Sequence, residues 1–128
     1  MEQAESERYM RRIFLCLYRR WRLRPLADPF MNEETEKYLR KCGVRNVTKN
    51  AEDILQDEEI EAVLICSSTD THSRYIMEAG KGRKAYFCEK PIDYDLGKVR
   101  EAIRTAEDAG VKLQIGFCRR FDHNHRGV

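Results

Sequence analysis

The chain has 128 residues, of which 36% are charged and 41% hydrophobic, and its formal net charge is only +2. This length suits one domain or part of a larger enzyme, and the composition excludes a disordered chain. The longest apolar runs, Ile13 to Tyr18 and Ala62 to Cys66, are far shorter than the roughly 20 residues of a membrane span, and the N-terminus does not read as a secretory signal. We therefore expect a cytoplasmic protein that does not enter a membrane.

The five cysteines are widely spread and form no CxxC pair. An odd, unclustered set argues against a disulfide framework and against a zinc site. His123 and His125 form an HxH pair without further ligands, which is too weak a pattern to indicate a metal. We expect reduced, mostly buried thiols and no metal site.

The first 25 residues differ in composition from the rest of the chain. They hold seven arginines, no lysine and three glutamates, a net charge of +4, whereas the other 103 residues carry −2. Such a segment could be a basic arm that binds nucleic acid or an acidic partner. It contains neither the strand nor the glycine-rich turn with which a nucleotide-binding sheet normally opens.

From residue 26 onward, segments of helical and of strand character alternate. Asn32 is a plausible N-cap for a helix that starts with glutamates and ends at Gly43. A short strand is predicted at 44–47, and Asn50 caps a brief helix behind it.

The second half of the chain continues this alternation. Ala62 to Cys66 is a continuous apolar run, which is typical of a parallel strand covered on both faces. Thr71 or Ser73 opens the next helix, which ends near Gly80 and Gly82. The remaining predicted elements are a strand at 85–88, a helix at 95–110 and a strand at 113–117.

Strands that alternate with helices predict an α/β fold with a Rossmann-like, doubly wound parallel sheet over residues 26–128. In such a sheet, ligands bind beyond the carboxyl ends of the strands. Asp28 follows the first readable strand, where a carboxylate can accept hydrogen bonds from ribose hydroxyls and repel a 2′-phosphate, which favours NAD over NADP. The alternative is an aspartate that only starts a turn before Pro29.

Two further strand ends carry polar residues. Ser67, Ser68 and Thr69 offer hydroxyls and amides that suit phosphate or ribose, with His72 in the first turn of the following helix. The alternative is ordinary helix capping by Thr69 or Thr71, with His72 in solvent.

Glu89 and Lys90 follow the strand at 85–88. A lysine held beside a carboxylate can stabilise charge on an oxygen as hydride leaves the carbinol carbon, and Pro91 fixes the backbone behind it, with a cis peptide bond as one option. The alternative is a surface ion pair without function. After the last strand, Arg119 and Arg120 could bind hydroxyls, carboxylates or phosphate.

The order and spacing of four motifs resemble the Gfo/Idh/MocA family of nicotinamide-dependent oxidoreductases, and within it the inositol dehydrogenases. The motifs are Ala27–Pro29, Ile65–His72, Phe87–Pro91 and Gly116–Phe121. The resemblance implies NAD as cofactor, a polyol or sugar as substrate, and homo-oligomers among intact relatives.

The resemblance also implies roles for single residues. Asp28 would bind the adenosine ribose, Lys90 would be the catalytic lysine at the reacting hydroxyl, and Glu89 would contact the nicotinamide side. The other cofactor-binding residues implied are Ser67, Ser68, Thr69, His72, Cys118 and Arg119.

Three departures from the family pattern stand out. The glycine-rich turn is missing, position 118 is Cys where relatives usually have Asn, and the second domain that supplies the substrate pocket and a histidine base does not follow. We therefore expect a truncated fragment of an NAD-dependent dehydrogenase that is inactive as this chain.

A frame shift would explain the first departure. Read two nucleotides later, permitted codons for residues 1–14 encode a GxGxxG turn and the start of its helix, with the frame restored between about residues 15 and 26. On this interpretation residues 1–25 are out of frame, and residues 26–128 are an incomplete NAD-binding domain. The alternative function is a non-enzymatic α/β binding module that uses its Arg-rich N-terminus.

Overall fold

The computed structural model describes residues 25–125. The chain divides into two compact units, residues 1–54 and 55–128, and each is considered by itself. The hypotheses of a basic arm and of an out-of-frame glycine-rich turn concern residues that lie outside the described part, so both remain predictions.

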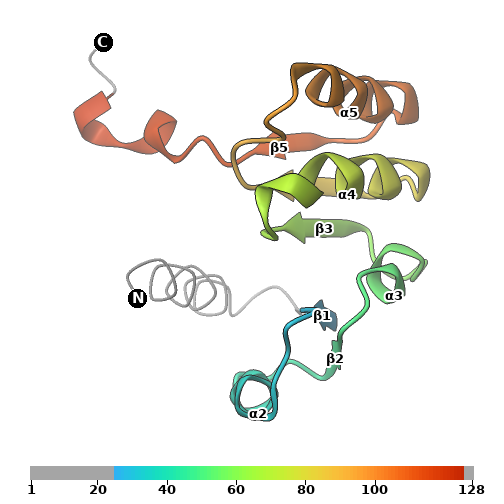
Figure 1. Cartoon of the computed structure of the whole chain (residues 1–128), viewed down its shortest axis with the longest axis vertical. Coiled ribbons are helices and arrows are strands. Elements are labelled where there is room, and N and C mark those ends of the chain that lie inside the picture. The colour runs from blue at the N-terminus through green and yellow to red at the C-terminus, as the bar shows by residue number, and fades with distance from the viewer. Residues whose placement is uncertain (1–24, 126–128) are drawn as a thin grey trace. The chain divides into compact units, whose positions relative to one another are not determined.

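The first unit is a small parallel pair of strands with one helix. The strand β1 (Pro25–Ala27) pairs in parallel with β2 (Asn46–Thr48), and the helix α2 (Glu33–Lys41) connects them (Figure 1). The short helix α3 (Glu52–Leu55) follows β2. A core of Met31, Leu39 and Val44, flanked by Leu26 and Val47, holds these elements together.

The sequence signals for α2 are confirmed. Asn32 Oδ1 accepts a hydrogen bond from the Thr35 N–H at 2.8 Å, and Gly43 takes a positive φ of 92° just beyond the helix. The predicted strand at 44–47 begins two residues later, at Asn46, because the Val44 N–H donates to the Leu39 carbonyl of α2 at 3.1 Å. The Val44 side chain is buried in the core. Hydrophobicity alone did not separate a core contact from a strand residue.

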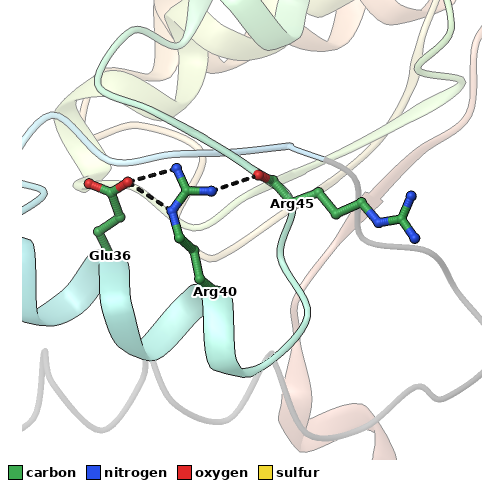
Figure 2. Close-up of polar contacts among 3 residues, drawn as sticks. All are labelled: Glu36, Arg40 and Arg45. Atoms are coloured by element: carbon green, nitrogen blue, oxygen red, sulfur yellow. Dashed lines mark hydrogen bonds and ion pairs between the residues drawn. The ribbon is translucent and has the colours of Figure 1, made fainter.

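Arg40 fastens the turn between α2 and β2 (Figure 2). Its Nε and Nη2 donate to Glu36 Oε1 at 2.9 and 2.7 Å, and its Nη1 donates to the Arg45 carbonyl at 3.0 Å. One guanidinium thus joins the last turns of α2 to the residue before β2.

The second unit has a three-stranded parallel sheet in the order β3–β4–β5. Its strands are β3 (Ala62–Ile65), β4 (Ala85–Cys88) and β5 (Leu113–Ile115), and the connecting helices are α4 (Thr69–Lys81) and α5 (Leu96–Ala109) (Figure 1). Two short 3₁₀ turns, η1 (Cys118–Phe121) and η2 (His123–His125), follow β5. Every strand pairing is parallel, which confirms the predicted α/β class.

The helices α4 and α5 pack on one another, and α4 covers β3 and β4. Ile76, Ala79 and Ala102 are fully buried between these elements. Gly80 permits the close approach, because a Cβ there would lie 3.0 Å from Thr105 Cγ2. At the amino end of the sheet, the buried Lys84 ammonium donates to the Asp57 and Ile60 carbonyls. These hydrogen bonds hold the loop that leads into β3.

The Tyr86 hydroxyl is buried and, among the described residues, meets no hydrogen-bond partner. A buried hydroxyl left unsatisfied costs about 1–3 kcal/mol. We therefore expect Tyr86→Phe to raise the free energy of unfolding by about 1 kcal/mol, measured by urea denaturation. Tyr94→Phe is the matched control, since Tyr94 is 80% exposed and should not change stability. A destabilised Tyr86→Phe variant would mean that the hydroxyl has a partner in solution.

Candidate functional site

The carboxyl ends of β3, β4 and β5 lie side by side. Ile65 is paired with Cys88, and Cys88 is paired with Ile115, so the three strands end at the same level of the sheet. The polar segments that follow, 67–69, 89–90 and 118–119, therefore leave from one edge. The sheet brings together three of the four strand ends that the sequence singled out.

The β3–α4 junction is held by its own hydroxyls. Ser67 Oγ and Thr71 Oγ1 are 2.6 Å apart, and Thr71 Oγ1 donates to the Ser68 carbonyl at 2.7 Å. The helix begins at Thr69, two residues before the earlier of the expected starts, and its N-cap Ser68 makes no side-chain cap bond. Capping by Thr69 or Thr71 was therefore the wrong expectation for this junction.

His72 is buried, which contradicts the alternative that placed it in solvent. It is 1% exposed, although it lies in the first turn of α4 as predicted. Its Nδ1 is 2.8 Å from the Pro91 carbonyl oxygen, and its Nε2 is 2.8 Å from the Ser67 carbonyl oxygen. Both ring nitrogens are thus engaged with backbone, and the imidazole links two of the three strand ends.

The β4 end places Glu89 and Lys90 directly at this edge. The Glu89 N–H donates to the Ile65 carbonyl at 2.9 Å, and Glu89 Oε2 accepts from the Lys90 N–H at 3.3 Å. The carboxylate is half-buried and contacts backbone, while Lys90 is exposed. The Lys90–Pro91 peptide bond is cis.

Gly116, which the sequence reading used only as the start of a motif, shapes the space around Glu89. A Cβ at this position would lie 3.0 Å from Phe87 Cζ and 3.1 Å from Glu89 Oε2. The glycine therefore leaves room for the carboxylate beside β5. A glycine near the end of the strand predicted at 113–117 was the signal that could have identified it.

A second, part-buried contact holds the loop behind Lys90. Ser73 Oγ donates to Asp93 Oδ2 at 2.5 Å, and Ser73 is 3% exposed. Two hydrogen bonds lower the pKa of Asp93 below its ordinary value of 3.8. The one from the Ser73 hydroxyl has the larger effect, and the one from the Asp95 amide has the smaller. This pair was not predicted from the sequence, because its two residues lie 20 positions apart.

The lowered pKa of Asp93 gives a pH-dependent prediction. A group whose pKa is lower in the folded state adds stability above its unfolded pKa and loses it as the pH falls through its folded pKa. We therefore expect Ser73→Ala to destabilise the chain at pH 7, with the difference from the unmodified chain shrinking as the pH falls below 3.8. Denaturation at several pH values measures this. Ser68→Ala, at an exposed serine, should show no such trend.

Cys118 and Arg119 are exposed in η1, and Arg120 lies over the Phe117 ring at 5.9 Å. Cys42 and Cys66 are also exposed, so the expectation of mostly buried thiols was wrong for the described cysteines. Cys88 is buried, and burial, followed by the charges of Cys66 and Glu89, raises its pKa to about 12. It remains a protonated thiol at neutral pH and is not a nucleophile.

Asp28 lies in the first unit, directly after β1. Its N–H donates to the Thr48 carbonyl at 3.0 Å, and its Oδ1 accepts from the Phe30 N–H at 2.9 Å. The turn that the sequence offered as an alternative is therefore present. Binding of the ribose by Asp28 is compatible with this turn and remains a prediction.

Residues 25–125 show neither a metal-ligand cluster nor a membrane-spanning helix. No group of three or more His, Cys, Asp or Glu side chains gathers as metal ligands do, and no helix has the length and apolar character to cross a membrane.

Comparison with known proteins identifies the family. Residues 11–117 match the sequence profile of the Gfo/Idh/MocA family, described as an oxidoreductase family with an NAD-binding Rossmann fold. The chain belongs to this family. The resemblance drawn from the four motifs is thereby confirmed, as is the Rossmann fold class, and the family's description agrees with the expected cofactor, NAD.

Among its relatives are two inositol dehydrogenases. Myo-inositol 2-dehydrogenase of Thermotoga maritima is 41% identical over 86 residues, which is 67% of this chain and 26% of that protein. Inositol 2-dehydrogenase of Rhizobium meliloti is 41% identical over 87 residues, or 68% of this chain and 25% of that protein. The chain thus spans about a quarter of the length of these relatives.

A solved structure shares the fold. Scyllo-inositol dehydrogenase from Lactobacillus casei, with bound NAD(H) and scyllo-inositol, superposes with a TM-score of 0.76 at 29% identity. The match covers 88% of this chain and 33% of that one.

Proposed function

We propose that residues 26–128 form the nucleotide-binding part of an NAD-dependent dehydrogenase that oxidises a ring hydroxyl of a cyclitol or sugar. The observation that carries the proposal is the common edge at which β3, β4 and β5 end, with Lys90 exposed there. The Thermotoga and Rhizobium relatives, both named as inositol 2-dehydrogenases, support the substrate class.

The proposed chemistry moves a hydride and a proton from a secondary alcohol. NAD supplies the hydride acceptor when it is bound. The carbinol carbon loses hydride, its hydroxyl loses a proton to a base, and the alcohol becomes a ketone. Lys90 contributes by placing an ammonium beside the hydroxyl oxygen, where it stabilises the negative charge that develops. By the family resemblance, the base would belong to the substrate domain.

The other strand-end residues have binding roles in this proposal. Ser67, Ser68 and Thr69 present hydroxyls and amides at the N-terminus of α4 to the nucleotide, where a helix terminus favours negative charge. Glu89 would face the nicotinamide side, next to Cys118 and Arg119 on η1. These assignments follow the family resemblance and the shared edge.

Asp28 gives the test of cofactor choice. We expect the chain to bind NAD more tightly than NADP, because the Asp28 carboxylate accepts ribose hydroxyls and repels a 2′-phosphate. Asp28→Asn keeps an acceptor for the Phe30 amide but removes the charge, and should weaken NAD binding about tenfold and narrow the preference over NADP. Calorimetric titration measures both affinities.

Asp108→Asn, at an exposed position on α5, is the matched control and should change neither affinity. Equal binding of NAD and NADP by the unmodified chain would contradict the role proposed for Asp28.

A further inference from the structure

His72 links two segments that approach the site from different strands. Its helix follows β3, whereas the Pro91 carbonyl that it contacts belongs to the residue directly after Lys90. The Ser67 carbonyl on its other side belongs to the hydroxyl-rich β3–α4 junction. Since the ring is 1% exposed, water does not compete for either contact.

The chemistry of these two contacts restricts the state of the ring. A carbonyl oxygen can only accept a hydrogen bond, and a neutral imidazole carries one N–H and one nitrogen lone pair. In either neutral tautomer, one ring nitrogen would direct its lone pair at a carbonyl oxygen 2.8 Å away. Only the imidazolium, with a proton on each nitrogen, donates to both oxygens.

The charges on the surrounding segments are compatible with a cation. The segments that carry or contact the ring hold five carboxylates and three cations, and the β3–α4 junction contributes one thiol. The N-terminal end of α4 disfavours a cation there, and the two charge-assisted hydrogen bonds oppose that effect. The charged groups are Asp70, Arg74, Glu78 and Lys81 on α4, and Glu89, Lys90, Asp93 and Asp95 on the β4–α5 segment; the thiol is Cys66 after β3.

We infer that His72 is a positioning residue for Lys90: as a buried imidazolium, it holds the Lys90–Pro91 segment against the end of β3. The inference rests on the proposed function in assigning Lys90 to the reaction. That His72 holds this segment is inferred only from the two carbonyl contacts and from burial, so it can be tested without nucleotide. The two claims can therefore fail separately.

The first test reads the protonation of the ring in the full chain. The sequence has only three histidines, so nitrogen-15 spectra of the imidazoles are readily assigned by comparison with a His72 variant. At pH 7 both nitrogens of His72 should carry protons that exchange slowly with water, while the exposed His123 should show no slowly exchanging ring proton. A single protonated nitrogen on His72 would overturn the inference.

The second test separates the two contacts with a matched pair of variants. The amide nitrogen of asparagine can replace His72 Nδ1, which contacts Pro91, and that of glutamine can replace Nε2, which contacts Ser67. Hydrogen exchange at the Glu89 and Lys90 amides should therefore be at least tenfold faster in His72→Gln than in His72→Asn. Exchange in α5 should be equal in both variants.

Equal exchange at Glu89 and Lys90 in the two variants would contradict a role in positioning that segment. If either variant fails to fold, the ring spectrum of the unmodified chain still decides whether His72 donates from both ring nitrogens or from one. Failure to bind NAD would count against the proposed function and would leave both of these readouts unchanged.

Discussion

Lys90→Ala is expected to lower kcat by about 10²–10³, because it removes the cation that stabilises charge on the reacting oxygen. The variant is tested in a chimera with the Thermotoga myo-inositol 2-dehydrogenase. In it, the 86 residues of this chain that align with that enzyme replace their counterparts, and the Thermotoga protein supplies the remainder. Steady-state NADH formation from inositol measures kcat and KM separately. KM should change less than kcat, since the charge develops only in the transition state.

Lys112→Ala is the matched control for this prediction. Lys112 is also exposed, but it precedes β5 and so lies at the amino end of the sheet. Its replacement should leave kcat within about twofold of the unmodified chimera. A Lys90→Ala chimera that retains full turnover would show that Lys90 does not act on the reacting hydroxyl, whatever the nucleotide affinity.

Gly116→Ala in the same chimera is expected to weaken NAD binding about tenfold, which corresponds to about 1.4 kcal/mol. A Cβ at 3.1 Å from Glu89 Oε2 and 3.0 Å from Phe87 Cζ forces the carboxylate to move by a few tenths of an ångström. The fold should survive, because the carboxylate is the far end of a flexible side chain. Fluorescence titration with NAD measures the affinity.

The cause of the Gly116 effect is tested by a double-mutant cycle. Once Glu89→Ala has removed the carboxylate, adding Gly116→Ala should weaken NAD binding by less than it does in the unmodified background. If both backgrounds lose the same affinity, the glycine acts through the Phe87 ring or the backbone and not through Glu89.

The fold could be predicted where local chemistry and periodicity agreed. Asn32 marks a helix start by a rule that acts within a few residues, and it behaves as expected. The helix predicted at 95–110 is present as α5, one residue shorter at each end. The apolar run at 62–66 predicted β3 for the same reason. Alternating strands and helices then fixed the parallel direction of the pairing, and with it the edge at which Lys90 lies.

The sequence could not reveal contacts between residues distant in the chain. His72 looks like a polar residue at a helix start, and only its approach to Pro91, 19 positions later, shows that it is buried. The Ser73–Asp93 pair and the space that Gly116 leaves for Glu89 have the same origin, because each depends on how adjacent parallel strands align. The start of α4 was misjudged for a related reason, since the Thr71 hydroxyl bonds to the Ser68 carbonyl instead of capping an amide.

Mapping NAD onto the full chain by amide chemical shifts is the most direct test of the account. If NAD binds at the strand ends of the second unit, the amide signals of Thr69, Lys90 and Arg119 should move together, with a common saturation curve. Shifts confined to one of these three strand ends, or different saturation curves for the three residues, would contradict an NAD site built from all three.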